Sequence, residues 1–301
     1  MGEAERQHRR GVALIAASAL VWSFAGVFMR LAPPDLWVVQ FWRAASGAAA
    51  LYLFMLWRER SGVLAAMRLS ARGWAAMVVS AAAMVTYIAA LHLTSVAEVM
   101  IVAATMPMVT AAIAWAALGE RPTPRVLATS LVALLGIVVM VGGAPAFDNL
   151  VGDAVALAMT ALFALLIVVA RHDHAIDMTV VNAHSATLVA LLSIPLAGGR
   201  LLDVSAGDLA LLALFGATTT ALAFALFLYG ARRVPPAESA LILLLDNSLS
   251  PVWVWLAFAE RPGPAALAGG AIVFLAVLSH LAADLLAARP RAAAAPMQGR
   301  K

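Results

Sequence analysis

The stretch AEVMIVAATMPMVTAAIAWAALGERPTPRVLATSLVALL at residues 97–135 is matched without a gap, 140 residues later, by AESALILLLDNSLSPVWVWLAFAERPGPAALAGGAIVFL at residues 237–275. Both copies carry a Glu-Arg-Pro-x-Pro turn between two apolar runs, at residues 120–124 and 260–264. Apolar segments align easily by chance, but a polar turn in the same register does not. The repeat therefore predicts a duplicated membrane protein.

The composition agrees with a membrane protein. Hydrophobic residues make up 64% of the chain and charged residues 12%, with a mean hydropathy of +0.94, whereas soluble domains are about 45–50% apolar and about 25% charged. The chain has no Cys, which excludes disulfides, thiolate metal sites and a Cys nucleophile. The net charge of +4 comes from Arg residues scattered as short flanks between apolar runs. This scatter indicates membrane topology and no nucleic-acid partner.

Apolar runs of the length needed to cross a membrane, roughly 20 residues, occur ten times. The predicted spans are 11–28, 36–56, 73–93, 96–118, 126–141, 152–170, 178–196, 209–229, 237–258 and 265–285. The connections between them are short and rich in Pro and Gly, which leaves no room for a soluble domain. We expect a tail at residues 1–10, five-helix repeats at 11–144 and 150–286, and a second tail at 287–301.

The Arg and Lys residues predict the orientation. With the N-terminus in the cytoplasm, 16 basic residues fall on the cytoplasmic side, three fall outside and Arg43 lies within a span. Both termini are then cytoplasmic, in the inner membrane of a bacterium.

Five spans in each half place the two Glu-Arg-Pro turns on opposite sides of the membrane. The predicted fold is therefore an all-α integral membrane protein of ten transmembrane helices, built as two inverted five-helix repeats. Inverted repeats are how many secondary transporters obtain two near-equivalent conformations, with a substrate site near the midplane. The alternative is that duplication only made a larger bundle.

Several residues together resemble the EamA-type branch of the drug/metabolite transporter superfamily. They are Trp22, Phe24, Arg30, Arg43, the segment from Tyr87 through Glu98, Pro107, Glu120-Arg121-Pro122, Leu228 and Glu260-Arg261-Pro262. The resemblance covers nearly the whole chain, and it is greatest to bacterial amino-acid exporters of the YddG type. It implies a ten-helix carrier with a cavity lined by the first, third, fourth, sixth, eighth and ninth spans, which exports small metabolites or drugs.

Ionisable residues at membrane depth are the main candidates for a binding site. Asp246 lies near the middle of the ninth span, where we expect it to bind a substrate amine or a proton; it is followed by Asn247 and Ser250. The alternative is a buried polar strut between helices. The repeat partner of Asp246 is Met106, so the two halves differ at this point.

Arg43 lies about 10 Å inside its span at the α-helical rise of 1.5 Å per residue. It has the chemistry to pair with Asp246 or to hold a substrate carboxylate. Snorkelling to the surface and binding of backbone carbonyls are equally compatible with its position. Trp22, Tyr87 and Trp253 lie deep in their spans and suit an apolar pocket, although packing against lipid is an alternative for each.

The remaining acidic residues are predicted to be structural. Ser95 and Glu98 fit a capping box, and Glu238 follows two prolines at the start of a helix. The turns Glu120-Arg121-Pro122 and Glu260-Arg261-Pro262 are expected to close helices. The histidines near or inside spans, which include His280, are expected to pack by hydrogen bonding.

The enzyme motifs His-Glu-x-x-His and Gly-x-Ser-x-Gly are absent, as is a P-loop. We therefore expect no catalytic residues, no metal and no cofactor. The predicted function is export of small metabolites, with neutral and especially aromatic amino acids as the first substrate class and a lipid bilayer as the surroundings. Alternatives are export of cationic drugs or of nucleotide-sugar-like metabolites, a channel, or a membrane scaffold. The repeat architecture does not require an oligomer.

Overall fold

The structure is a computed structural model, and it describes residues 3–33, 35–59, 67–94, 96–141, 150–173, 175–259 and 263–287. All regular secondary structure in these residues is helical. The first repeat contains α1 (Glu3–Trp22), α2 (Ala25–Leu31), α3 (Leu36–Glu59), α5 (Ala71–Leu93), α6 (Val96–Ala104), α7 (Met106–Leu118) and α8 (Pro124–Met140). The second contains α9 (Leu150–His172), α10 (Met178–Ala197), η1 (Gly198–Leu202), α11 (Ala206–Phe215), η2 (Gly216–Ala223), α12 (Phe224–Ala231), α13 (Pro236–Leu243), α14 (Leu245–Phe258) and α15 (Pro264–Ala287).

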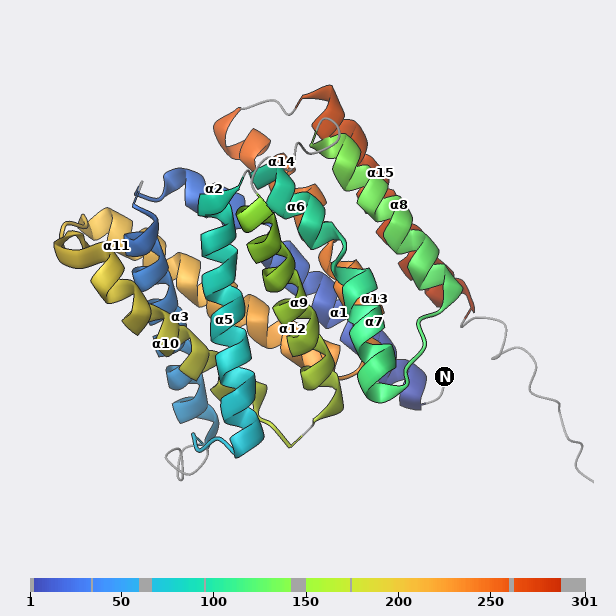
Figure 1. The fold of residues 1–301 in the computed structure, drawn as a ribbon, viewed down its shortest axis with the longest axis horizontal. Helices are drawn as coiled ribbons and strands as arrows, with labels where there is room; N and C mark the ends of the chain where they lie inside the picture. Colours follow the sequence, from blue (N-terminus) through green and yellow to red (C-terminus); the bar gives the residue numbers. More distant parts are fainter. Residues whose placement is uncertain are drawn as a thin grey trace, which may run out of the picture.

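These helices form a bundle whose segments run side by side (Figure 1). Among the described residues, six segments are long and apolar enough to cross a membrane: Glu5–Leu31, Leu150–His172, Met178–Leu202, Ala206–Ala231, Pro236–Phe258 and Pro264–Ala283. The helices Met106–Leu118 and Pro124–Met140 are apolar but shorter. The chain is therefore an all-α membrane protein, as its composition predicts.

Helix packing follows the duplication. The second segments of the two repeats, α3 and α10, pack together, and so do the fifth, α8 and α15. The third segment of the first repeat, α5, packs on α9, while its counterpart in the second repeat, α12 with η2, packs on α1. Exchanging the two repeats therefore leaves this packing pattern unchanged, which is what a two-repeat protein requires.

The fourth and ninth segments are interrupted at nearly equivalent positions. The break between α6 and α7 falls at Thr105, and the break between α13 and α14 falls at Leu244, one residue short of the repeat offset. Pro107 explains the first break, because proline lacks the N–H of a continuous helix and clashes with the preceding turn. Asp246 and Asn247 directly follow the second break, where no side chain caps the start of α14.

The basic residues collect on the side where α1 begins, which we call the N-terminal side. Arg58 pairs with Asp177 there, and Arg72 pairs with Asp173. Arg125 and Arg232 bind the backbone carbonyls of His280 and Ile176, respectively, so that the ends of helices are tied together. On the opposite side, Arg200 pairs with Asp35.

Candidate functional site

A cavity of about 290 Å³ lies between the two repeats. Its wall is formed by Trp22, Ala25, Arg43, Met84, Tyr87, Val99, Met100, Ala103, Met106, Met159, Phe163, Ile167, Thr219, Thr220, Phe224, Phe227, Ala240, Leu243, Leu244, Asp246 and Asn247. These residues come from the six segments that the resemblance implies and, through Arg43, from α3 as well. Met106 and Asp246, which the repeat makes equivalent, both lie in this wall.

Aromatic side chains cover one part of the wall. Trp22 packs edge-on against Phe224, with ring centroids 5.4 Å apart, and against Phe227 at 5.7 Å. Its indole Nε1 donates a hydrogen bond to the carbonyl of Thr219 at 2.9 Å, so that the ring is held in one orientation. An apolar pocket with a few placed polar groups is the usual form of a small-molecule site.

The carbonyl that binds Trp22 belongs to η2, which is a π-helix. A π-turn loosens the regular helix bonding, and such turns are frequent at functional sites. Asn182 of α10, which is 1% exposed, donates from Nδ2 to the next carbonyl, that of Thr220, at 2.7 Å. Trp22 and Asn182 therefore stabilise the irregular backbone that brings Thr219 and Thr220 to the cavity.

Arg43 is half-buried in the wall. Its Nη2 donates to Gln40 Oε1 at 2.8 Å, and its guanidinium carbon lies 5.4 Å from the centre of the Phe215 ring. These contacts on one edge and one face hold the guanidinium in place within the protein. Ion pairing with Asp246, one of the roles considered from the sequence, does not occur among the described residues.

Asp246 is the second residue of α14, directly after the break at Leu244, and it lines the cavity. Within the described part of the chain, its carboxylate has no hydrogen bond or ion pair. The described contacts therefore give no support to the interpretation of Asp246 as a polar strut between helices. Tyr87 lies in the same wall as Arg43 and Asp246.

Asn247 also lines the cavity, but Ser250 and Trp253 do not. Ser250 lies against Gly26, where a Cβ on the glycine would collide with its hydroxyl. Trp253 donates from Nε1 to Ser23 Oγ at 2.8 Å and stacks on Phe24 with centroids 4.6 Å apart. Both residues therefore join α14 to the break between α1 and α2, beside the cavity.

The residues predicted to be structural lie away from the cavity where they are described. Glu120 is 4.0 Å from the guanidinium of Arg171, and Arg121 lies over the ring of Trp115 at 6.0 Å. Pro122 stands between the left-handed Gly119 that ends α7 and Thr123, which caps α8. Ser95, Glu260, Arg261 and Pro262 lie outside the described residues, as does the side chain of Glu98.

Glu238 lies in the first turn of α13, as predicted, but its carboxylate does not cap the helix. It is 5% exposed and lies 3.4 Å from His8 Nε2 and 3.7 Å from His280 Nε2. The cluster joins α1, α13 and α15 at the N-terminal side. The sequence alone does not predict it, because the three residues are far apart in the chain.

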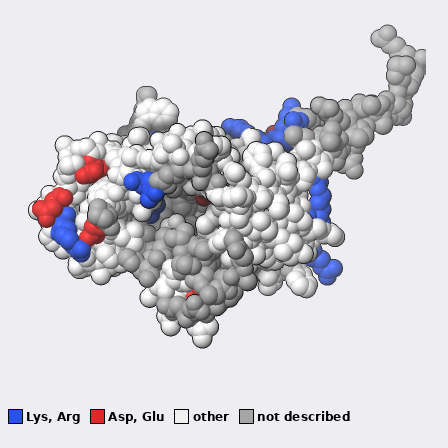
Figure 2. All heavy atoms as spheres, turned by 90° about the horizontal axis from the view of Figure 1, so that it is seen from above, with Lys and Arg blue, Asp and Glu red and all other residues white. Residues whose placement is uncertain are grey.

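Two of the helix segments that border the cavity pack tightly against each other on the N-terminal side. Gly11 of α1 and Gly230 of α12 approach so closely that a Cβ on either would press on the carbonyl oxygen of the other. Viewed from the opposite side, the surface is hollowed near its centre, with basic side chains nearby (Figure 2).

Several lining residues were not singled out from the sequence. Four methionines, Met84, Met100, Met106 and Met159, contribute adaptable apolar surface. The sequence does not predict their place in the wall, because a Met that lines a cavity and a Met that packs against lipid look alike in an apolar span. Within the described residues, no cluster of His, Asp and Glu has the grouping needed to hold a metal ion.

Comparison with known proteins agrees with this architecture. The model of the EamA-like transporter family matches the chain twice, at residues 9–142 and 150–281. A solved structure titled only "Crystal structure of protein" shares 23% sequence identity with a TM-score of 0.76, and the match covers 91% of this chain and 98% of that chain. At this identity, the likeness shows the fold alone. No curated protein matches the chain.

Proposed function

Because the chain belongs to the EamA-like transporter family, and is therefore a membrane transporter of small solutes, we propose that it exports amino acids by alternating access. The proposed substrates are neutral amino acids, aromatic ones first, as in the YddG-type exporters that the sequence resembles.

The observation that carries the substrate class is the position of Asp246. A carboxylate without a partner among the described residues opens into a cavity whose wall also holds Arg43 and Tyr87. An amino acid carries an ammonium group for the carboxylate and a carboxylate group for the guanidinium. The rings of Trp22 and Phe227 supply apolar surface for its side chain.

The broken helices support the same assignment. The first turn of α14, at Asp246, and the first turn of α7, at Met106, both border the cavity. Discontinuous helices that direct their N-terminal ends at the midplane commonly bind the anionic groups of substrates, because these ends carry unpaired N–H groups and a partial positive charge. The volume of about 290 Å³ is close to the lower end of the roughly 300–1,000 Å³ of ligand pockets, which favours one small solute.

Alternating access is proposed from the two repeats and from the tight packing of α1 on α12 at the N-terminal side. Rocking of one repeat against the other would separate Gly11 from Gly230 and open the cavity towards that side. The Arg residues concentrated there favour a cytoplasmic location for the N-terminal side, in the inner membrane of a bacterium. Tight packing towards the cytoplasm then corresponds to the conformation that releases an exported solute.

Cationic drugs are the second candidate, because Asp246 is the acidic residue in the wall. Arg43 in the same wall disfavours a solute that carries only positive charge. Neutral zwitterions and cations therefore differ in which of the two residues they need.

The deciding experiment is uptake of labelled amino acids, one at a time, into proteoliposomes that hold the purified protein, with and without an imposed pH gradient. Saturable uptake of an amino acid is expected, and Asp246→Asn should lower it at least tenfold. Asp203→Asn, which removes an exposed carboxylate outside the cavity, is the matched control and should leave uptake unchanged.

Three outcomes would contradict the proposal. Saturable uptake of cationic drugs with no uptake of any amino acid would favour the second candidate. Flux that does not saturate would indicate a channel, and no flux of any solute would indicate a scaffold. A response of wild-type uptake to the gradient that Asp246→Asn abolishes would show that Asp246 carries a proton.

A further inference from the structure

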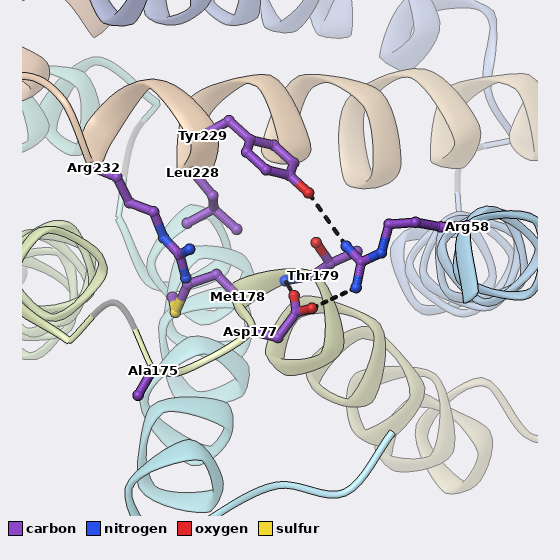
Figure 3. A pocket seen from close by; sticks show the side chains of 8 residues that line it. All are labelled: Arg58, Ala175, Asp177, Met178, Thr179, Leu228, Tyr229 and Arg232. Carbon is purple, nitrogen blue, oxygen red and sulfur yellow. Dashed lines mark hydrogen bonds and ion pairs between the residues drawn. The ribbon is translucent and has the colours of Figure 1, made fainter. Parts of the chain in front are cut away.

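A second cavity, of about 340 Å³, lies at the N-terminal side between the end of α3, the start of α10 and the end of α12. Its lining is Arg58, Ala175, Asp177, Met178, Thr179, Leu228, Tyr229 and Arg232 (Figure 3). No described residue lines both this pocket and the central cavity. The two sites are therefore distinct.

One edge of the pocket is held by an ion pair. Arg58 Nη2 lies 2.6 Å from Asp177 Oδ2, and Arg58 Nη1 donates to the hydroxyl of Tyr229 at 3.3 Å. The other carboxylate oxygen of Asp177 accepts from the backbone N–H of Thr179, which caps α10. The one carboxylate of the pocket is thus committed to structural contacts that fix Arg58 and Tyr229 in place (Figure 3).

The second cation of the pocket is not balanced. Arg232 enters from the end of α12, and its described hydrogen bond goes to the neutral carbonyl of Ile176. Among the described residues, no carboxylate forms an ion pair with it. One guanidinium has five N–H donors, so Arg232 retains donors for an anion. With two arginines and one carboxylate, the pocket carries one excess positive charge.

Nearby aromatic residues place the pocket at the level of lipid headgroups. Trp57, adjacent to Arg58, is 72% exposed, and Tyr229 of the pocket itself is 37% exposed. Exposed Trp and Tyr at helix ends mark the membrane–water interface. Phe54, one turn before Arg58 on the same face of α3, is also exposed and offers apolar surface on the bilayer side of the pocket.

We propose that this pocket binds the phosphate of an anionic phospholipid in the leaflet at the Arg-rich side. Arg232 and Arg58 provide the planar N–H groups that suit phosphate oxygens, and Tyr229 provides a hydroxyl donor. Basic pockets between membrane helices are known to bind acidic headgroups. The acyl chains of a bound lipid would follow the exposed face of α3.

The test uses the purified full chain, washed free of lipid in detergent, and follows thermal unfolding during titration with dioleoylphosphatidylglycerol. Dioleoylphosphatidylcholine is the neutral-headgroup control, and sn-glycerol 3-phosphate is the soluble phosphate control. Arg232→Gln removes the unbalanced cation. Arg72→Gln removes a cation on the same side but outside the pocket, where Arg72 is 84% exposed, and serves as the matched control.

Phosphatidylglycerol is expected to raise the unfolding temperature. The lipid concentration at half-saturation should be about tenfold higher for Arg232→Gln than for the wild type. Arg72→Gln should titrate like the wild type. Tyr229→Phe, which keeps the ring but removes the hydroxyl, should raise the half-saturating concentration of phosphatidylglycerol about fivefold. This variant tests the site even if Arg232→Gln does not fold.

Three results would overturn the proposal. One is that Arg72→Gln weakens phosphatidylglycerol binding as much as Arg232→Gln does, which would indicate diffuse attraction to the negative charge of the lipid. Another is equal stabilisation by phosphatidylcholine, which would remove the requirement for an anion. The third is equal stabilisation by sn-glycerol 3-phosphate, which would make the ligand a soluble phosphate. Uptake through the central cavity is measured separately, so failure here leaves the proposed transport function untouched.

Discussion

Trp253 and Ser23, 230 residues apart, are joined by a hydrogen bond of 2.8 Å from the indole Nε1 to the hydroxyl. Ser23 is fully buried and marks the end of α1, while Trp253 lies in α14 and stacks on Phe24. The pair therefore links the break in the first segment to the second half of the ninth. Both segments line the central cavity.

Ser23→Ala removes the acceptor of the Trp253 N–H. We expect a loss of about 1 kcal/mol in unfolding free energy, because a partly buried donor loses its partner. Thermal unfolding in detergent measures it. Since Trp253→Phe removes the same bond, the double variant should lose less than the sum of the two single losses. Additive losses would show that the bond does not stabilise the protein.

Arg43→Lys separates a substrate-binding role from a structural one. Lysine keeps the charge but loses the planar fork and the flat contact with Phe215. If Arg43 holds a substrate carboxylate, KM for amino acids should rise about tenfold, while uptake of the corresponding amines, which lack the carboxylate, stays unchanged. Equal losses for both classes would instead indicate that Arg43 supports the cavity wall.

Asn182→Ala should destabilise the π-helix η2. The carbonyl of Thr220 would lose its donor in a buried place, at a cost of about 1–3 kcal/mol. Ser193→Ala is the control on the same helix, because Ser193 is equally buried and its described hydrogen bond goes to the carbonyl of Val189 in its own helix. Chemical denaturation of the two variants compares them. A loss in Ser193→Ala as large as that in Asn182→Ala would argue against a special role for η2.

The lowered pKa of Asp177 predicts that the stability of the protein depends on pH. Burial alone would raise its pKa, but hydrogen bonds from Arg58 and from the backbone of Thr179 outweigh burial and lower the pKa below the usual value of 3.8. Because the folded pKa lies below the unfolded one, the stabilisation is fully present above the usual value and is lost as the pH falls through the folded pKa.

The matched variant for this effect is Asp177→Asn. Thermal unfolding measured from about pH 7 down to about pH 3 should show a smaller acid-induced loss in the variant than in the wild type. Identical slopes in the two proteins would contradict the assignment.

Some residues of the cavity wall can be predicted from the sequence, because the prediction depends on single residues. Asp246 was recognised because a charge in an apolar run is costly unless it has a function or a partner. Trp22, Tyr87 and Asn247 also lie in the cavity wall. Trp253 and Ser250 were also expected in the cavity wall, but they face the break between α1 and α2. The spacing of residues along the sequence does not show how far an interrupted helix is rotated about its axis, so it does not predict which side chains face the cavity.

The amino-acid sequence by itself determined the all-α membrane class and the duplication. Both depend on local properties: runs of apolar residues long enough for a bilayer, and a Glu-Arg-Pro-x-Pro turn repeated in register. Tertiary structure alone decided which faces of the helices meet. It brought His8, Glu238 and His280 together, gave Thr219 and Thr220 their partners across the bundle, and left Asp246 without a described partner. The physical reason is that such contacts join residues far apart in the chain, and their energies depend on how whole helices pack rather than on any segment alone.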